Sequence, residues 1–249
     1  MHLFDLTGKT ALITGASGGL GQQFARCLSN AGARVLLTAR RFGEIQALAN
    51  ELGNARALAI DVSDRVSIKS AFEQFSATDE QIHICINNAG IGKTTPIFDS
   101  AENDNFENIL QTNVIGVWYL TRAVANHMKG NGIRGSIINI GSINGSGAYP
   151  GKMATGYNVS KAAVLHMTRS LVAELAPHGI RINSISPGYF PTQQDEENRD
   201  FIRKKIPLDF IPKLNDLDGL ILYLASDYAS RYVTGSCFTI DGGMSYAEK

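Results

Sequence analysis

The sequence has little of what a secreted, membrane-embedded or nucleic-acid-binding protein requires. Its three cysteines, Cys27, Cys85 and Cys237, are far apart and lie within apolar patterns, which favours buried reduced thiols over a disulfide framework. No stretch approaches the roughly 18 apolar residues of a membrane span, and the N-terminus does not have the pattern of a secretion signal. Lysine plus arginine equals aspartate plus glutamate at 23 each, so no net charge attracts nucleic acid or an anionic membrane. These absences predict a cytoplasmic protein with a small-molecule partner, and without a nucleic-acid or membrane partner.

The sequence also lacks signs of a metal site or of a second domain. No cluster of His, Cys and carboxylate residues has the spacing of metal ligands, so no metal is expected. No Pro-rich or Ser-rich linker divides the 249 residues, a length that suits one domain because single α/β domains often run to roughly 200–250 residues. We therefore expect a single domain over residues 1–249.

Short apolar runs alternate with longer segments of helical period along the whole chain. Strands are expected at Thr10–Thr14, Arg34–Thr38, Arg56–Ile60, His83–Asn87, Ser136–Ile140, Arg181–Ser186 and Cys237–Ile240. Helices are expected at Leu20–Ala31, Phe42–Leu52, Val66–Ser76, Phe106–Met128, Thr155–Ala176 and Leu217–Ser226. Continuous apolar strands that are separated by helices must be joined by crossovers. This predicts a single-domain, Rossmann-like α/β fold: a doubly wound sheet of about seven parallel strands with helices on both faces.

One charge-dense segment, residues 192–205, follows a Pro-Gly turn. Such a segment is either a solvated helix face or a mobile cover. Open α/β sheets bind ligands beyond the carboxyl ends of their strands, and this segment leaves such an end. A substrate lid around residues 192–210 is the sharper of the two hypotheses.

A glycine-rich turn directly follows the first expected strand and opens the first helix. In this context the backbone N–H groups and the helix dipole can hold a pyrophosphate. The residues predicted to do so are Gly15, Ser17, Gly18, Gly19, Leu20 and Gly21. The turn therefore predicts a dinucleotide cofactor.

The end of the second strand indicates which dinucleotide is preferred. A carboxylate there would bind the ribose 2′-hydroxyl of NAD, whereas an arginine can pair with the 2′-phosphate of NADP. This chain has Ala39 followed by Arg40, which favours NADP(H), with NAD(H) as the alternative. Ser17 could add a hydroxyl to the same phosphate. A solvent-facing role for Arg40 is the competing interpretation.

Tyr157 and Lys161 are four residues apart within a helical pattern. Side chains at this spacing lie on one face of a helix and can share a site as an acid/base pair. Taken alone, the pair is more often an ordinary part of a helix surface. The interpretation therefore depends on the residues around it.

Taken together, the motifs make the chain resemble the short-chain dehydrogenase/reductase family from about Leu6 to Gly243. They are TGASGGLG at 14–21, Asp61 after the third strand, NNAG at 87–90, Asn113 in QTNVIG, Ser142 in NIGSI, YNVSK at 157–161, PG at 187–188 and the final DGG. The resemblance implies hydride transfer between NADP(H) and a carbonyl or alcohol. It also implies a homo-oligomer, a tetramer or dimer, built on the helices expected at Phe106–Met128 and Thr155–Ala176.

The resemblance implies a role for each of four residues. Tyr157 would be the general acid in reduction and the general base in oxidation. Lys161 would hold the nicotinamide ribose and lower the pKa of the phenol, which is about 10 when unperturbed. Ser142 would hydrogen-bond the substrate oxygen, and Asn113 would support a water that links Lys161 to bulk solvent. Taken alone, Ser142 could cap a turn and Asn113 could be a satisfied core amide.

Further cofactor contacts are implied by the resemblance alone. They are Asp61 and Val62 near the adenine, Asn87, Ala89 and Gly90 beside the cofactor, and Pro187, Gly188, Phe190 and Thr192 around the nicotinamide amide. For Asn87, a structural role between adjacent strands is an equal alternative. Two residues depart from the family pattern: His83 where an Asp is usual and Phe210 where an Arg is usual.

The substrate is less clearly indicated. The expected pocket is lined by Ile143, Asn144, Tyr149, Met153, Tyr189 and part of the lid, a mixture compatible with many ketones. A 3-oxoacyl-thioester reductase (acyl carrier or CoA) and a sugar-acid dehydrogenase are both open, the latter because PGYFPT resembles the turn in some of those enzymes. A catalytically silent NADP(H)-binding regulatory protein is the non-enzyme alternative.

Overall fold

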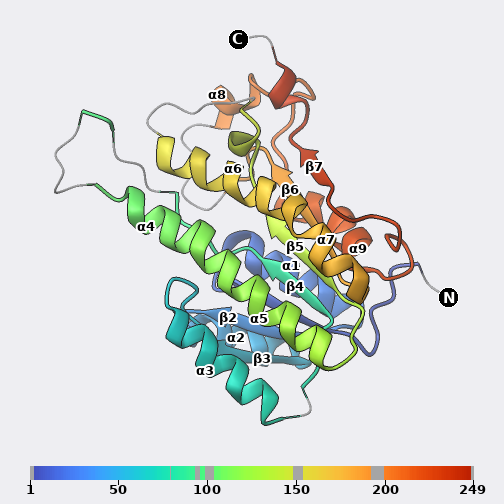
Figure 1. Cartoon of the computed structure of the whole chain (residues 1–249). Coiled ribbons are helices and arrows are strands. Elements are labelled where there is room, and N and C mark those ends of the chain that lie inside the picture. Colours follow the sequence, from blue (N-terminus) through green and yellow to red (C-terminus); the bar gives the residue numbers. More distant parts are fainter. Residues whose placement is uncertain are drawn as a thin grey trace.

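A computed structural model describes residues 3–78, 80–92, 96–98, 104–147, 154–191 and 199–247 (Figure 1). Its strands are β1 (Thr10–Thr14), β2 (Arg34–Ala39), β3 (Ala55–Ala59), β4 (Ile84–Asn87), β5 (Ser136–Ile140), β6 (Arg181–Pro187) and β7 (Cys237–Ile240). They form one parallel sheet in the order β3-β2-β1-β4-β5-β6-β7. The predicted doubly wound sheet of seven parallel strands is confirmed. The strand order reverses between β1 and β4, and ligands bind beside such a switch point.

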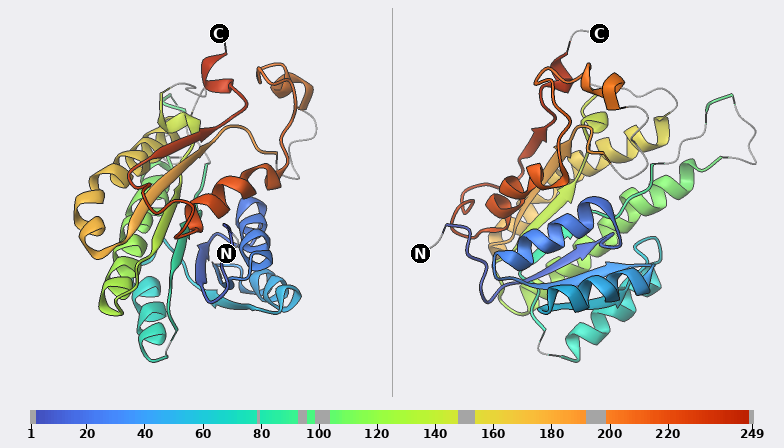
Figure 2. Two further views of the ribbon diagram at one scale, coloured as in Figure 1. Left: turned by 90° about the vertical axis from the view of Figure 1, so that its right-hand side faces the viewer. Right: turned by 180° about the vertical axis from the view of Figure 1, so that it is seen from behind.

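Helices cover both faces of the sheet (Figure 2). One face is covered by α1 (Gly19–Asn30), α2 (Phe42–Leu52) and α9 (Asp218–Ala225). The other is covered by α3 (Arg65–Ser76), α5 (Val117–Gly130) and α6 (Thr155–Ser170), with α7 (Val172–Leu175) at the end of α6. The shorter α4 (Phe106–Leu110) and α8 (Arg199–Arg203) lie beyond the carboxyl ends of the strands.

The central strands β1 and β4 are largely apolar because they are buried on both faces. In β1, Ala11 and Ile13 pack in the core under α1 and α2, whereas Leu12 packs in the core under α3 and α5. Successive strand residues point to opposite faces, so a strand between two helix layers is favoured by apolar residues on both of its faces. This preference explains the apolar runs that predict the sheet.

The two long helices differ from the prediction. The segment expected as one helix, Phe106–Met128, is α4, a π-helical turn at Gln111–Gly116, and α5. At Gly116 an added Cβ would lie 2.4 Å from the carbonyl oxygen of Val62, so the backbone of this turn packs directly against the residues after β3. The helix expected at Thr155–Ala176 is interrupted at Leu171. Helical periodicity continues across both interruptions, which is why the sequence pattern does not reveal them.

Two histidines accept hydrogen bonds from the backbone where β1 and β4 begin. His83, which departs from the family pattern, accepts from the Thr10 N–H through Nδ1 (3.1 Å). His127 of α5 accepts from the Ile82 N–H through Nε2 (3.2 Å). An imidazole nitrogen can accept only while it is unprotonated. Burial lowers the pKa of both side chains, and the nearby Lys9 lowers that of His83 further.

We expect the stability of the fold to decrease as the pH falls below about 6.5, the pKa of an unfolded histidine. Because the folded pKa values lie lower, the unfolded state takes up protons first, so this contribution to stability is intact above that pH and lost below it. Urea unfolding of the wild type and of His83→Asn at about pH 7.5 and about pH 5.5 measures the effect. The Asn amide oxygen accepts the Thr10 N–H without titrating, so the variant should lose less stability on acidification. Equal losses would contradict the assignment to His83.

Candidate active site

A cleft of about 1180 Å³ opens at the carboxyl ends of β1 to β4. Its walls are the glycine-rich turn after β1, the arginines after β2, the residues after β3 and the segment after β4. The predicted cofactor residues that line it are Gly15, Ser17, Gly18, Gly19, Arg40, Asp61, Val62, Ala89 and Gly90. Residues that are distant in sequence are therefore brought to one cleft at the switch point of the sheet.

Glycine is present at the positions of the first turn for different geometric reasons. A Cβ at Gly21 would lie 2.2 Å from the carbonyl oxygen of Gly15, so only glycine fits in the first turn of α1, where Leu20 precedes it. Gly15 has a φ of +66°, and its Cβ would lie 2.9 Å from the Cα of Ala89. Gly19 has a φ of +51° with no atom within 4 Å of an added Cβ. The turn is thus tightly packed behind and open toward the cleft, as a backbone cradle for a phosphate requires.

The two asparagines after β4 have distinct roles. Asn87 is 3% exposed, and its Nδ2 donates to Thr121 Oγ1 (2.9 Å) and Asn139 Oδ1 (2.7 Å). These contacts match the structural role between adjacent strands, which is one of the two roles left open for Asn87. Asn88, which the sequence analysis did not select, lines the cleft and donates through Nδ2 to the Thr14 carbonyl (2.9 Å). Its position inside the NNAG motif could have identified it from the sequence.

Arg41 is a second residue that the sequence analysis missed. Its Nη2 donates to Ser17 Oγ (3.1 Å), and its Nη1 lies 2.8 Å from Glu44 Oε1. Arg40 is exposed and lines the same cleft. The expected position of the 2′-phosphate therefore has two guanidinium groups and one hydroxyl nearby, whereas the prediction named only Arg40 and Ser17. The presence of two consecutive arginines after β2 could have identified Arg41 from the sequence.

The predicted acid/base residues meet on α6 next to the end of β5. Lys161 is 6% exposed, and its Nζ donates to the carbonyl of Ile140 (2.7 Å). That Nζ lies 5.6 Å from the centre of the Tyr157 ring. Ser142 is 8% exposed and forms a side-chain hydrogen bond with Tyr157. The fold thus brings these three side chains together.

Burial changes the pKa values of this group, and one expectation is wrong. Burial lowers the pKa of Lys161 to about 8. It raises the pKa of Tyr157, and the group that opposes this rise is Ser142, through its hydrogen bond. Lys161 is not among the groups that change the pKa of this phenol, and its ammonium group donates to the Ile140 carbonyl instead.

Asn113 lies on the π-helical turn and faces Lys161 across Gly90. Its Oδ1 accepts from the Ile91 N–H (2.8 Å), and its Nδ2 donates to the Ile91 carbonyl (2.9 Å) and to Ser160 Oγ (3.0 Å). Both amide hydrogens are used, whereas Oδ1 keeps a second lone pair. A Cβ at Gly90 would lie 3.2 Å from Asn113 Oδ1 and 3.6 Å from Lys161 Nζ. The amide oxygen and the ammonium group therefore border one small space.

The residues expected around the nicotinamide lie at the end of β6. Pro187 ends the strand, and a Cβ at Gly188 would lie 2.6 Å from the Cβ of Asp241. Phe190 is partly buried against the core under α1. Of the expected substrate pocket, Ile143 and Tyr189 belong to one apolar cluster. Thr192, Tyr149, Met153 and the first part of the expected lid, residues 192–198, lie outside the described residues.

Among the described residues, no group of three or more His, Cys, Asp or Glu side chains is arranged to hold a metal ion. No helix within the same residues is both long enough and apolar enough to span a membrane.

Comparisons with known proteins cover nearly the whole chain. Residues 15–245 match the family model described as Enoyl-(Acyl carrier protein) reductase. The chain is 33% identical to gluconate 5-dehydrogenase of Gluconobacter oxydans, over 97% of this chain and 96% of that protein. It is 34% identical to the 3-oxoacyl-(acyl-carrier-protein) reductase FabG of Haemophilus influenzae, over 96% and 99%. A solved structure of gluconate 5-dehydrogenase from Burkholderia cenocepacia, in complex with NADP and tartrate, has a TM-score of 0.91 at 32% identity, over 99% and 98% of the two chains.

Proposed function

The chain belongs to the short-chain dehydrogenase/reductase family, and from this premise we propose that it catalyses reversible hydride transfer between NADP(H) and a ketone or aldehyde and the corresponding alcohol. The observation that carries the proposal is the group of buried Ser142, buried Lys161 and partly buried Tyr157, whose Lys161 Nζ lies beside Gly90 of the cofactor cleft. A catalytically silent binding protein would not need to keep a phenol, a hydroxyl and an ammonium group together at the cost of burial.

The cleft fits a dinucleotide cofactor by the shape of its backbone. The first turn of α1 is open toward the cleft at Gly19 and closed behind at Gly21, and the arginines beside Ser17 supply positive charge. When bound, NADPH supplies the hydride, and the protein supplies alignment and a proton. Asp61 and Val62 would contact the adenine end, and Gly188 and Phe190 the nicotinamide end.

Tyr157 would donate a proton to the carbonyl oxygen during reduction and remove it during oxidation. Ser142 would donate a hydrogen bond to the same oxygen and stabilise the charge that develops there. Lys161 is buried beside Tyr157 and, with a pKa of about 8, is mostly protonated at neutral pH. A water between Lys161 Nζ and Asn113 Oδ1, beside Gly90, would return the proton to Tyr157 from bulk solvent. The free lone pair of Asn113 Oδ1 supports this path.

NADP(H) is the proposed cofactor, with NAD(H) as the alternative. Arg41 bonded to Ser17, with Arg40 next to it, supports binding of a 2′-phosphate. The Burkholderia relative, whose solved complex contains NADP, supports the same choice.

The proposed substrate class is a small hydroxy or keto compound, with sugar acids first and 3-oxoacyl thioesters second. Both classes appear in the names of relatives at similar identity. NADPH oxidation with a keto-gluconate, an acetoacetyl thioester and diacetyl, a small activated diketone, tests the assignment. Turnover of the keto acid alone would support a sugar-acid dehydrogenase, and turnover of the thioester alone would support an acyl reductase. No turnover of any of the three would contradict the proposed reaction.

A cytoplasmic location is also proposed. Cys27, Cys85 and Cys237 are all free in the structure, and the first two are buried. Three unpaired thiols suit a reducing compartment, where disulfides do not persist.

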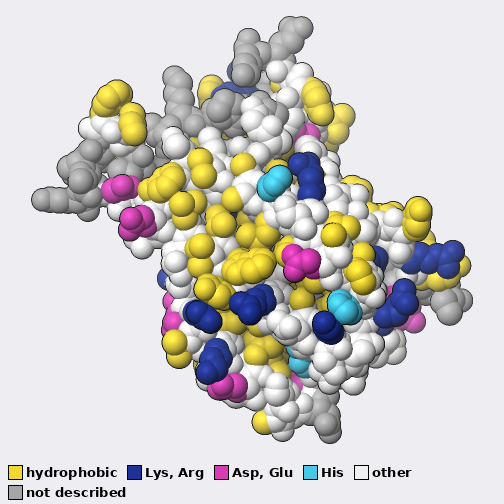
Figure 3. All heavy atoms as spheres, in the orientation of Figure 1, with side chains coloured by type: hydrophobic (Ala, Val, Ile, Leu, Met, Phe, Trp, Pro, Cys, Tyr) yellow, Lys and Arg dark blue, Asp and Glu magenta, His cyan; other side chains and the backbone are white. Residues whose placement is uncertain are grey.

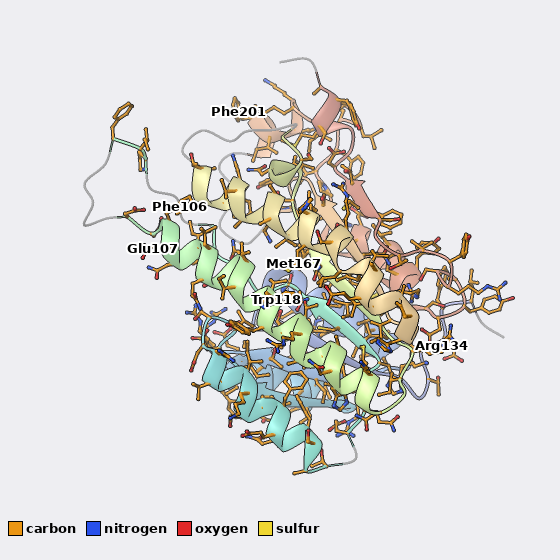
Figure 4. All side chains as sticks on the ribbon, in the orientation of Figure 1. Phe106, Glu107, Trp118, Arg134, Met167 and Phe201 are labelled. Carbon is orange, nitrogen blue, oxygen red and sulfur yellow. The ribbon has the colours of Figure 1, made fainter. Side chains whose placement is uncertain are left out.

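A homo-oligomer, a dimer or tetramer, would cover the face formed by α4, α5 and α6. Hydrophobic side chains gather on this face (Figure 3). They include Phe106, Ile115, Trp118 and Val159, each between 37% and 45% exposed. Trp118 of α5 and Met167 of α6 lie toward the same side (Figure 4), beside a groove of about 570 Å³ between α5 and α7. An apolar face of this kind supports a two-fold interface.

Trp118→Glu should convert the oligomer into monomers, as measured by light scattering after size exclusion. Burying an unpaired carboxylate costs several kcal/mol, which would raise the dissociation constant by more than about 100-fold. Trp118 is the single tryptophan of the chain, so its fluorescence should also report assembly in the wild type. Val66→Glu on α3, where Val66 is 72% exposed, is the control and should leave the oligomer intact. Unchanged mass in Trp118→Glu would refute this interface.

A further inference from the structure

The short 3-10 turn after β5, residues Ile143–Gly145, is fastened to α6 at two points. A Cβ at Gly145 would lie 2.6 Å from the carbonyl carbon of Lys161, so the backbone of the turn rests directly on the backbone of the helix. One residue earlier, Asn144 Nδ2 donates to Asn158 Oδ1 (3.0 Å). Both amides are half-buried. The two contacts fix the distance between the turn and the first part of α6.

The amide pair adjoins both members of the Ser142 and Tyr157 hydrogen bond. The Asn144 backbone N–H donates to Ser142 Oγ (3.2 Å), and Asn158 follows Tyr157 directly. Because Ser142 Oγ accepts this bond, its own hydrogen is free to point at the phenol oxygen. Bonds in such a chain strengthen one another. The side-chain hydrogen bond between Asn144 and Asn158 therefore links the turn that carries Ser142 to the helix that carries Tyr157.

The start of α6 needs an anchor of this kind. Its N-cap, Ala154, makes no side-chain capping bond, and helix ends without caps fray. Tyr157 and Asn158 lie in the first turn, where fraying would displace the phenol. The Asn144 amide supplies a contact from outside the helix at that turn.

We propose that Asn144 and Asn158 are positioning residues that hold Ser142 and Tyr157 in register for proton transfer. The inference rests on the proposed function, since it concerns the same acid/base group. Neither amide needs to touch the reacting atoms. Each acts through its neighbour, Asn144 through Ser142 and Asn158 through Tyr157.

The test uses Asn158→Leu, which keeps the side-chain volume and removes the bond, and Asn158→Asp, which keeps an acceptor oxygen for Asn144 Nδ2. With diacetyl and NADPH, Asn158→Leu should lower kcat by roughly 10- to 100-fold, because small misplacements of reacting groups are costly, while the KM for NADPH stays near the wild-type value. The alkaline midpoint of its pH–rate profile should also move to higher pH, since Ser142 no longer favours the phenolate. Asn158→Asp should recover most of kcat.

Matched variants separate this proposal from a simple loss of folding. Gln46→Ala removes an exposed amide–amide bond, Gln46 Nε2 to Asn50 Oδ1 (2.9 Å), and should change neither kcat nor the pH profile. If Asn158→Leu does not fold, as judged by its melting temperature, Asn144→Ala takes its place. Wild-type kcat and pH profile in the folded variant would overturn the proposal, and so would equal losses in Asn158→Leu and Asn158→Asp. Wild-type turnover in Tyr157→Phe would instead overturn the proposed function itself.

Discussion

Replacing Tyr157 with phenylalanine should lower kcat for NADPH-dependent reduction of diacetyl by roughly a thousandfold, within the range of proton-transfer catalysis. The substitution removes one oxygen from a side chain whose ring is held beside Lys161 Nζ at 5.6 Å, so the fold and the cleft should remain. NADPH affinity, measured by nicotinamide fluorescence, should change little. A large loss of kcat with intact cofactor binding separates chemistry from binding.

Tyr232→Phe is the matched control, because Tyr232 is fully exposed at 100% and lies outside the site. It should keep wild-type kcat. Equal turnover in the wild type and Tyr157→Phe would refute the acid/base role, whereas loss of NADPH binding in Tyr157→Phe would mean that the substitution had disturbed the cleft.

The sequence predicts best the elements that are defined by local pattern. The bounds of β1, α2, β5 and β7 agree with the structure residue for residue, because each is an apolar or amphipathic run between turn residues. The π-helical turn at Gln111–Gly116 is different. It depends on the close approach of Gly116 to Val62 and on the bonds between Asn113 and Ile91. These contacts join distant segments, so helical period alone cannot reveal them.

The same division applies to the candidate site. Tyr157 and Lys161 could be paired from their spacing, because one helix carries both. The sequence could not tell that Arg41 is bonded to Ser17, since the two lie on different turns that meet only in the fold. The bond between Asn144 and Asn158 joins a turn and a helix in the same way. The rise in the pKa of Tyr157 was also out of reach, because it comes from burial by the complete site.

The second large effect is expected at the arginine pair after β2. Arg40→Ala and Arg41→Ala should each raise the Kd for NADPH by roughly 10- to 100-fold, since a hydrogen bond to a charged group contributes about 1.5–3 kcal/mol. In the double variant the Kd for NADPH should rise by about a thousandfold if the two contributions are largely additive. The Kd for NADH, which has no 2′-phosphate, should change little in all three variants. Titrations that follow nicotinamide fluorescence measure all of these values.

Arg41 should matter although the sequence indicates only Arg40, because Ser17 Oγ and Glu44 already hold its guanidinium at the cleft. A group that is ordered before binding loses less entropy when the phosphate arrives. Arg56→Ala is the control for a general loss of positive charge, since Arg56 pairs with Glu80 (3.4 Å) outside the cleft, and it should leave NADPH affinity unchanged. An NADPH preference that disappears in the double variant would direct substrate screening toward reduction. Equal affinity of the wild type for NADH and NADPH would remove the basis for NADP(H) and shift the search toward oxidation of an alcohol with NAD, without affecting the roles proposed for Ser142 and Tyr157.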